Sequence, residues 1–317
     1  MISEVTLQPV DAVDVTIVVD NFVDILLPST EAVRRAPLVG DWHRGDKLIA
    51  EHGFSLLVTV YKGTQTETML FDAGLGRETA VHNLDVLNMR VSDLRAVVLS
   101  HGHLDHHGGL EGIVRRVGRS RLPLVLHPDA WRERKMVFST GTEIHWPPPS
   151  RGDLEREGVE VLEDRNPSLL LDRMALVTGQ IDRATNFERG MPLQYARTCA
   201  GWEPDAWTWD DQALVMNLKS NGLVVLSSCS HAGIINVLRH AQRLTGLRKV
   251  YAVIGGLHLI GDIFEPTIPR TIEELSAIGP DMVVPCHCTG WKATHELARR
   301  LPEAYVQTSV GTRLHFA

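Results

Sequence analysis

Four histidines and one aspartate fall within the seven-residue run His101-Gly-His-Leu-Asp-His-His107. Imidazole nitrogens and carboxylate oxygens together suit zinc, iron, manganese or nickel better than calcium or magnesium. His101 and His103 are two residues apart, so their side chains point the same way on an extended backbone. Asp105 and His106 follow in the next turn and can face a second ion. A solvated polar loop is the alternative, but it does not account for this density of ligands, and we predict a metal site.

The segments on either side of this motif predict a rigid platform for it. Residues 96–99 are apolar and rich in valine, which indicates a short buried strand. Gly108-Gly109 follows the motif and lets the chain turn into a helix that begins near Leu110. We therefore expect the ligand side chains to lie on a loop at the end of a buried strand, which is a suitable place for a metal site.

Several other apolar strands also end in residues of metal-ligand type. They carry Asp72, Cys229 with His231, His258 and His287. Each of these alone could be structural, because a buried cysteine often acts as a small hydrophobic residue and a lone histidine is often part of a core. Their recurrence at the same structural position favours convergence on one edge of one or two sheets.

Composition limits the class of protein. The chain has 317 residues, a net charge of −7 and a pI of about 6.1, so we expect no nucleic-acid partner. It has no long apolar run and its N-terminus lacks the pattern of a signal peptide, so we expect no membrane contact and a cytoplasmic location. Three of the four cysteines lie beside histidines, which favours reduced thiols over a disulfide framework. A small-molecule substrate is the expected partner, and a homo-oligomer is left open.

The remaining pattern predicts a single α/β domain over residues 1–317. We expect helices over 77–87, from 110, 234–244, 268–278 and 293–301, and strands over 15–19, 54–61, 68–71, 96–99, 122–127, 174–177, 213–218, 223–226, 250–254, 282–285 and 312–316. Residues 128–209 differ in character, with clustered prolines and tryptophans. They are predicted to be an inserted lid or irregular region, either lining a substrate pocket or packing its aromatic rings on the core.

With these residues in view, the chain resembles the metallo-β-lactamase superfamily over nearly its full length. The resemblance implies an αββα sandwich with a dinuclear metal site at one edge of the sheets. The residues that carry it are Asp72 as the strand-end aspartate that supports the site, His101, His103, Asp105 and His106 as the main signature, His287 as the last histidine ligand, and Cys229 or His231 in the region that usually supplies a bridging aspartate.

More narrowly, the chain resembles a subgroup named after the archaeal-type dihydropterin ribofuranosylaminobenzene phosphate synthase. The runs that carry this likeness are 19–21, 178–183, 187–188, 210–213, 229–236, 255–258 and 287–290. Two residues depart from the subgroup pattern: Gln180 stands where glutamate is usual, and Ser228 where glycine is usual. These departures leave the substrate open.

The expected chemistry is hydrolysis by a metal-bound hydroxide. We expect two divalent transition-metal ions, zinc first and iron or manganese as alternatives, because two such ions lower the pKa of a shared water and polarise a substrate oxygen. Asp105 is the predicted proton acceptor. His258 or His231 would donate a proton to the leaving oxygen if it is not bound to metal. The substrate would be a small-molecule ester, lactone or phosphate ester.

Two other functions are alternatives to the hydrolase. The resemblance to the subgroup implies a synthase that forms a C–C or C–N bond on a pterin-type phosphorylated substrate. A non-catalytic metal-binding sensor would need the ligands but no activated water, so activity that chelators abolish would separate it from an enzyme.

The outer parts of the site are predicted less directly. Arg183, Asp211 and Asp20 are expected to contact substrate, Arg183 as a bidentate clamp on an anionic group; for Arg183 a salt bridge with Glu188 or Asp182 is the alternative. We expect His231 to bind metal and Cys229 to pack beneath the site, the alternative being that neither binds metal.

Overall fold

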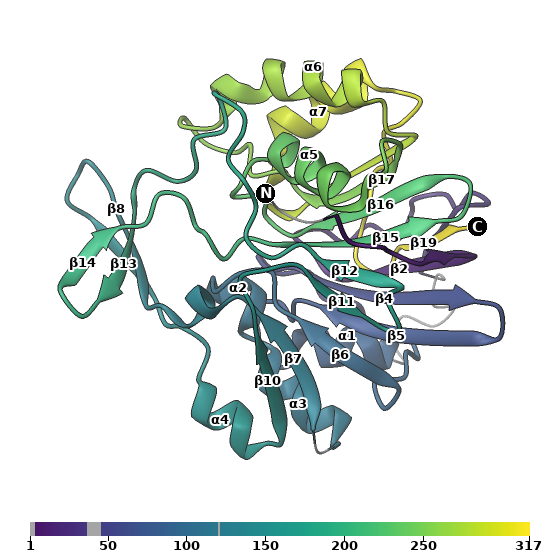
Figure 1. Cartoon of the computed structure of the whole chain (residues 1–317), viewed down its shortest axis with the longest axis horizontal. Coiled ribbons are helices and arrows are strands. Elements are labelled where there is room, and N and C mark those ends of the chain that lie inside the picture. Colours follow the sequence, from purple (N-terminus) through teal and green to yellow (C-terminus); the bar gives the residue numbers. More distant parts are fainter. Residues whose placement is uncertain (1–3, 37–45, 120) are drawn as a thin grey trace.

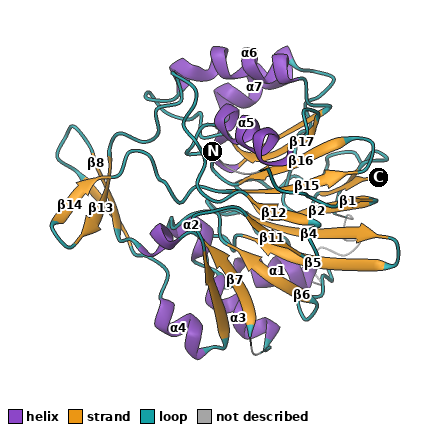
Figure 2. Cartoon of the chain, in the orientation of Figure 1, coloured by secondary structure: helices purple, strands orange, loops and turns teal. Residues whose placement is uncertain are grey.

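Two β-sheets face each other in the protein, and helices cover the outer face of each (Figure 1). The computed structural model describes residues 4–36, 46–119 and 121–317. Figure 2 shows the resulting layers, with helices above and below the stacked strands. The predicted αββα arrangement of an α/β protein is confirmed.

The first sheet contains eight strands in the described chain, in the order β10-β7-β6-β5-β4-β2-β19-β3. Their bounds are β2 Ala12–Val19, β3 Val33–Arg34, β4 Ser55–Lys62, β5 Gln65–Phe71, β6 Leu94–Val98, β7 Leu122–Leu126, β10 Val159–Glu163 and β19 Arg313–Phe316. Strands β5, β6, β7 and β10 run parallel to one another, and the other pairs are antiparallel.

The second sheet follows the order β11-β12-β15-β16-β17-β18, with β1 pairing to β15. Its strands are β1 Pro9–Val10, β11 Ser168–Leu170, β12 Ala175–Val177, β15 Ala213–Leu218, β16 Gly222–Ser227, β17 Val250–Gly256 and β18 Met282–Cys286. Strands β16, β17 and β18 are parallel. The carboxyl ends of parallel strands meet at one edge of a sheet, so the residues that follow these strands are brought together.

Apolar residues fill three layers between these elements. Side chains such as Ile17 and Phe71 of the first sheet meet Leu226 and Val284 of the second in the central layer. Helices α5 Ile234–Thr245, α6 Ile268–Ile278 and α7 Trp291–Arg300 pack on the second sheet, and α1 Thr79–Val86, α3 Leu110–Val117 and α4 Arg151–Arg156 on the first. The helices bury one face each, which is why their apolar residues recur at helical spacing.

A third, small sheet stands beside the sandwich (Figure 1). Its order is β14-β13-β8-β9, with bounds β8 Arg134–Val137, β9 Glu143–Trp146, β13 Gln194–Thr198 and β14 Gly201–Pro204. The remaining short elements are α2 Leu104–His107 and the 3-10 turns η1 Pro128–Trp131, η2 Glu265–Thr267 and η3 His287–Thr289.

Most expected elements are present with boundaries shifted by a few residues, but two expectations need correction. The irregular alternative for residues 128–209 is wrong: besides the expected strand at 174–177, which is β12, these residues supply β10 to the first sheet, β11 to the second, and all of the small sheet. Their pattern was obscured because these strands are short and several are half exposed. Asp105 and His106 lie in the short helix α2 and not in a loop.

The described residues contain no helix that is both long and apolar enough to cross a membrane.

Candidate metal centre

The strand ends deliver two neighbouring groups of metal-ligand side chains to the same edge. The first group contains His101 and His103, which follow β6, and His231, which follows β16. His101 Nε2 lies 3.0 Å from His103 Nδ1 and 3.1 Å from His231 Nε2. All three rings are buried. Nitrogens around a tetrahedral zinc ion are about 3.3 Å apart, as follows from Zn–N bonds of about 2.0–2.1 Å, so this spacing is close to that of a ligand set.

The second group contains Asp105 and His106 on α2 and His287 at the end of β18. Asp105 Oδ2 lies 3.2 Å from His287 Nε2 and 3.5 Å from His106 Nε2. His52 approaches the same carboxylate at 3.6 Å, with a largely exposed ring. The Cys229 Sγ lies 3.2 Å from His106 Nε2, between the two groups.

Hydrogen bonds determine which ring nitrogens of His101 and His103 are protonated. Asp72 accepts the only proton of the Ser100 hydroxyl, so His101 Nδ1 must donate to Ser100 Oγ across 2.8 Å. His103 Nε2 donates to Gln194 Oε1 at 2.7 Å. Both histidines therefore present an unprotonated nitrogen to each other at 3.0 Å. Two lone pairs at this distance repel unless a cation lies between them, so the residues fit a metal ion.

Burial keeps these rings in the neutral form that metal binding needs. It lowers the pKa of His103 to about 4 and the pKa values of His101 and His231 well below their usual range. His106 differs: burial acts to lower its pKa, but the carboxylates of Asp105 and Asp72 raise it to about 10. A divalent ion bound at His106 Nε2 would therefore have to displace a proton.

Backbone conformation at the strand ends is unusual in the same places. Asp72, Ser230, His258 and His287 have φ values of 60°, 56°, 45° and 45°, in the left-handed region that non-glycine residues rarely adopt. Each such residue costs roughly 1–3 kcal/mol and persists where the surrounding structure holds it, often at functional sites. Backbone strain therefore occurs at the same edge of the sheets as the candidate ligand side chains.

Asp72 is the buried anchor of the site. Its carboxylate accepts the backbone N–H and the hydroxyl of Ser100, each at 2.7 Å, and the Nδ1–H of His106 at 2.8 Å. It also accepts the hydroxyl of Ser228, the residue that stands in place of glycine. These bonds fix the ring of His106 with Nε2 facing the second group; the role of Asp72 in supporting a metal site stays a prediction.

Replacing Asp72 by asparagine is expected to weaken metal binding about 10- to 100-fold, the usual cost of losing a carboxylate that orients a histidine ligand. The amide can no longer accept the four bonds that the carboxylate accepts. Competition with a chromophoric chelator would measure the dissociation constant. The exposed Asp93→Asn is the control, and equal affinities for the two variants would contradict the role of Asp72.

A buried ion pair between Arg134 and Asp210 positions the segment that carries His101 and His103. Asp210 accepts the backbone N–H of Gly102 at 2.8 Å and is itself bound by Arg134. Arg134 also donates to Asp205, and Gln194 donates to the Asp205 carbonyl while accepting from His103. The small sheet thus reaches the metal ligands through β8 and β13.

A third group of ligand type lies against the first two. Cys288 Sγ is 3.3 Å from Cys229 Sγ, and His258 lies beside both. Burial raises the pKa of the Cys229 thiol well above its usual value. Cys229 was expected to pack beneath the site among apolar neighbours; it is buried, but its sulfur faces polar groups, His106 and Cys288.

Comparison with known proteins agrees with this geometry. Residues 50–171 match the family model described as the metallo-beta-lactamase superfamily. The solved structure of Tm1679, titled a metal-dependent hydrolase of the beta-lactamase superfamily, superposes with a TM-score of 0.73 at 22% identity and covers 95% of this chain and 98% of that one. Residues 50–171 therefore match the metallo-beta-lactamase superfamily, and the chain has the corresponding fold.

Two more relatives of this superfamily domain are informative. The chain is 29% identical over 273 residues to the 7,8-dihydropterin-6-methyl-4-(beta-D-ribofuranosyl)-aminobenzene-5'-phosphate synthase of Methanocaldococcus jannaschii, covering 84% of this chain and 90% of that protein. The metallo-beta-lactamase fold protein YhfI from Bacillus subtilis has the same fold, with a TM-score of 0.52 at 11% identity, covering 96% of this chain and all of that one. The resemblance found in the sequence is therefore confirmed.

The residues predicted to bind substrate are engaged in contacts with other parts of the chain. Asp20 accepts the backbone N–H of His287 at 2.8 Å, and Asp211 accepts that of Ala232 at 2.8 Å. Burial raises the pKa of Asp211 to about 6. Arg183 donates to backbone carbonyls at 2.5 Å, including that of Trp207, rather than to Glu188 or Asp182. A substrate contact for these residues stays a prediction.

Three residues at the site were not assigned from sequence. Cys288 follows His287 directly, and its place beside a predicted ligand was the available signal. His52 lies in a stretch rich in glycine and proline, of which residues 37–45 are outside the described chain. Gln194 carries no local signal, because its contact with His103 spans 91 residues.

Proposed function

We propose that the protein is a metal-dependent hydrolase that acts on a small-molecule ester, lactone or phosphate ester and uses two divalent transition-metal ions, with zinc as the first choice. The observation that carries the proposal is the 3.0 Å separation of one ring nitrogen of His101 from one of His103, both of which the other hydrogen bonds of these rings leave unprotonated. Two ions held there would act as Lewis acids and lower the pKa of a bound water.

The chain itself supplies a proton acceptor. Burial acts to raise the pKa of Asp105, but His106 and His287 hold it well below its usual range, so the carboxylate is ionised. Its side chain keeps a partly exposed face, about 20% accessible, and so can reach a water or substrate. Asp105 therefore combines the charge and the access that a proton acceptor needs.

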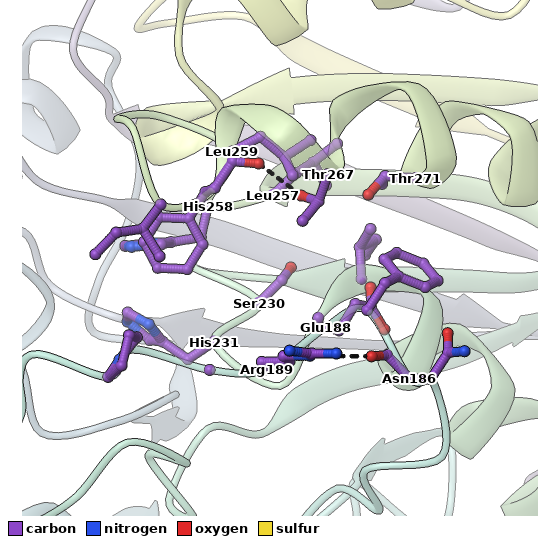
Figure 3. A pocket seen from close by; sticks show the side chains of 17 residues that line it. Asn186, Glu188, Arg189, Ser230, His231, Leu257, His258, Leu259, Thr267 and Thr271 are labelled. Carbon is purple, nitrogen blue, oxygen red and sulfur yellow. Dashed lines mark hydrogen bonds between the residues drawn. The ribbon is translucent and has the colours of Figure 1, made fainter.

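A cavity of about 680 Å³ opens beside the histidines and offers room for the organic part of a substrate. Figure 3 shows His231 and His258 at one end and Asn186 at the other, with Glu188 between. Most of the wall is apolar; its members include Phe187, Ile234, Leu257, Leu259, Ile263 and Phe264. This lining favours a substrate with an apolar or aromatic body whose scissile bond lies at the histidine end.

Metal content is the first test. The two histidine groups predict two transition-metal ions between them in protein purified without chelator. His103→Ala is expected to lose one of these two ions because the variant lacks one of the ligands of the first group. Elemental analysis of both proteins measures this. Metal-free wild-type protein, or an unchanged count in His103→Ala, would sink the proposal.

Activity is the second test. We expect hydrolysis of at least one member of a panel of carboxylic esters, lactones and phosphate esters, with members that carry an aromatic body preferred. Activity should disappear with a chelator and return with zinc. A metal-loaded protein that hydrolyses no member of the panel would point to the sensor or to the synthase.

The synthase is the second candidate because of one observation, the 29% identity over 84% of this chain to a protein of that name. Incubation with a phosphorylated dihydropterin, whose phosphate would leave as the new bond forms, and a ribofuranosyl-aminobenzene phosphate, followed by mass spectrometry, separates the two functions. A coupled product that requires the metal-loaded protein would favour the synthase, whereas hydrolysis fragments alone favour the hydrolase.

A further inference from the structure

Cys229, His258 and Cys288 form a compact group of three ligand side chains beside the histidine groups. Each comes from a different strand end: Cys229 follows β16, His258 follows β17, and Cys288 follows β18 in η3. One ligand atom from each lies within 4.8 Å of the other two, and the two sulfurs are 3.3 Å apart. Ligand atoms around a tetrahedral zinc ion are about 3.5–3.8 Å apart when Zn–S is about 2.3 Å, so a small adjustment would fit an ion.

The backbone around this group is shaped to let the side chains meet. Gly256 ends β17, and a Cβ built on it would lie 2.6 Å from Cys288 Sγ, so any other residue would push the thiol away. Two residues later, His258 adopts a φ of 45° in the left-handed region. Its Nδ1 is buried and has no hydrogen-bond partner among the described residues. An unpartnered buried nitrogen costs free energy unless a ligand satisfies it.

We propose that Cys229, His258 and Cys288 hold a third divalent ion of thiophilic character, such as zinc. Two sulfur ligands and one imidazole select such an ion over magnesium, calcium or manganese. The ion would also compensate buried thiolates, whose charge is otherwise costly away from water. Because His258 lines the 680 Å³ cavity, a fourth coordination position can face that cavity; three protein ligands with one open position are typical of catalytic zinc.

The proposal changes two expectations about these residues. Cys229 becomes a ligand shared by neighbouring ions, since its sulfur also faces His106 at 3.2 Å. His258 becomes a ligand too, which excludes it as the proton donor to a leaving oxygen. The inference rests on the proposed function only in its premise that the centre binds metal, and it does not depend on hydrolysis.

Cobalt binding tests the proposal without a substrate. Apo-protein would be titrated with Co²⁺ under anaerobic, reducing conditions while the near-ultraviolet thiolate-to-cobalt charge-transfer band is recorded. Wild-type protein is expected to bind about three equivalents, and Cys288→Ser about two, with a weaker charge-transfer band because the Co–S bonds of the third ion are lost. His258→Ala should also lose about one equivalent, so the result does not depend on one variant folding.

Cys286→Ser is the matched control. Cys286 is buried two residues away on the same segment, but its thiol faces the Val284 carbonyl and belongs to none of the ligand groups. It should keep the wild-type stoichiometry and band. Equal cobalt binding by wild type and Cys288→Ser would overturn the proposal and leave Cys288 as a hydrogen-bond donor to Cys229. A disulfide between the two cysteines that persists under reducing conditions would also overturn it. Wild-type protein that binds no cobalt at all would overturn both this proposal and the proposed function, because both need the centre to bind metal.

Discussion

Replacing Arg134 by alanine should destabilise the protein by about 3–5 kcal/mol, the usual cost of removing one partner from a buried ion pair. The Arg134 side chain is fully buried. Its guanidinium donates to Asp205 at 2.8 Å and to both oxygens of Asp210, at 2.6 and 3.1 Å. Alanine would leave two carboxylates buried without their cation, and a cavity where a large side chain had been.

Thermal and denaturant unfolding of the metal-free protein would measure the loss. The control is Arg116→Ala, because Arg116 forms a single ion pair with Asp85 at 2.7 Å but both side chains are half exposed. Exposed pairs contribute about 0–1 kcal/mol. If the two variants unfold at the same denaturant concentration, the buried pair does not stabilise the fold.

The same substitution should loosen the metal centre. Asp210 holds the backbone N–H of Gly102, which lies between two predicted ligands. A Cβ on Gly102 would lie 2.2 Å from the Ala130 carbonyl oxygen, so this segment is fixed on both sides. Arg134 therefore links the stability of the small sheet to the position of His101 and His103.

The candidate ligand residues could be brought together from sequence because the fold places them by a simple rule. Asp72, His101, Cys229, His258 and His287 each follow an apolar strand. Parallel pairing then brings those strand ends to one edge of each sheet. An apolar run followed by polar ligands is a local pattern, so a single sequence suffices to detect it.

The supporting contacts could not be found in this way because they join distant segments. Arg134 and Asp210 are 76 residues apart, and Gly102 and Asp210 are 108 apart. No local sequence pattern around a single arginine or glutamine indicates which distant residue it contacts. Residues 128–209 were read as one region for a related reason: short strands with mixed exposure, such as β10 and β11, lack the alternation by which strands are recognised.

Asp105→Asn is expected to reduce turnover of any hydrolysed substrate by about 10²-fold or more, while the fold is kept. Asparagine has nearly the same volume as aspartate but cannot accept a proton, so the substitution tests chemistry rather than packing. The carboxylate faces His287 at 3.2 Å and His106 at 3.5 Å, and its low pKa keeps it ionised at neutral pH.

The measurement is kcat and KM with metal in excess, because Asp105 is also a predicted ligand and its loss could lower metal occupancy. A 10²-fold loss in kcat corresponds to about 2.7 kcal/mol of transition-state stabilisation. Asp85→Asn, at an exposed carboxylate in a surface ion pair, should keep wild-type turnover. Activity of Asp105→Asn within about threefold of wild type would remove Asp105 from the mechanism. If excess metal restores the activity of this variant fully, Asp105 acts as a ligand and the proton acceptor must be another group.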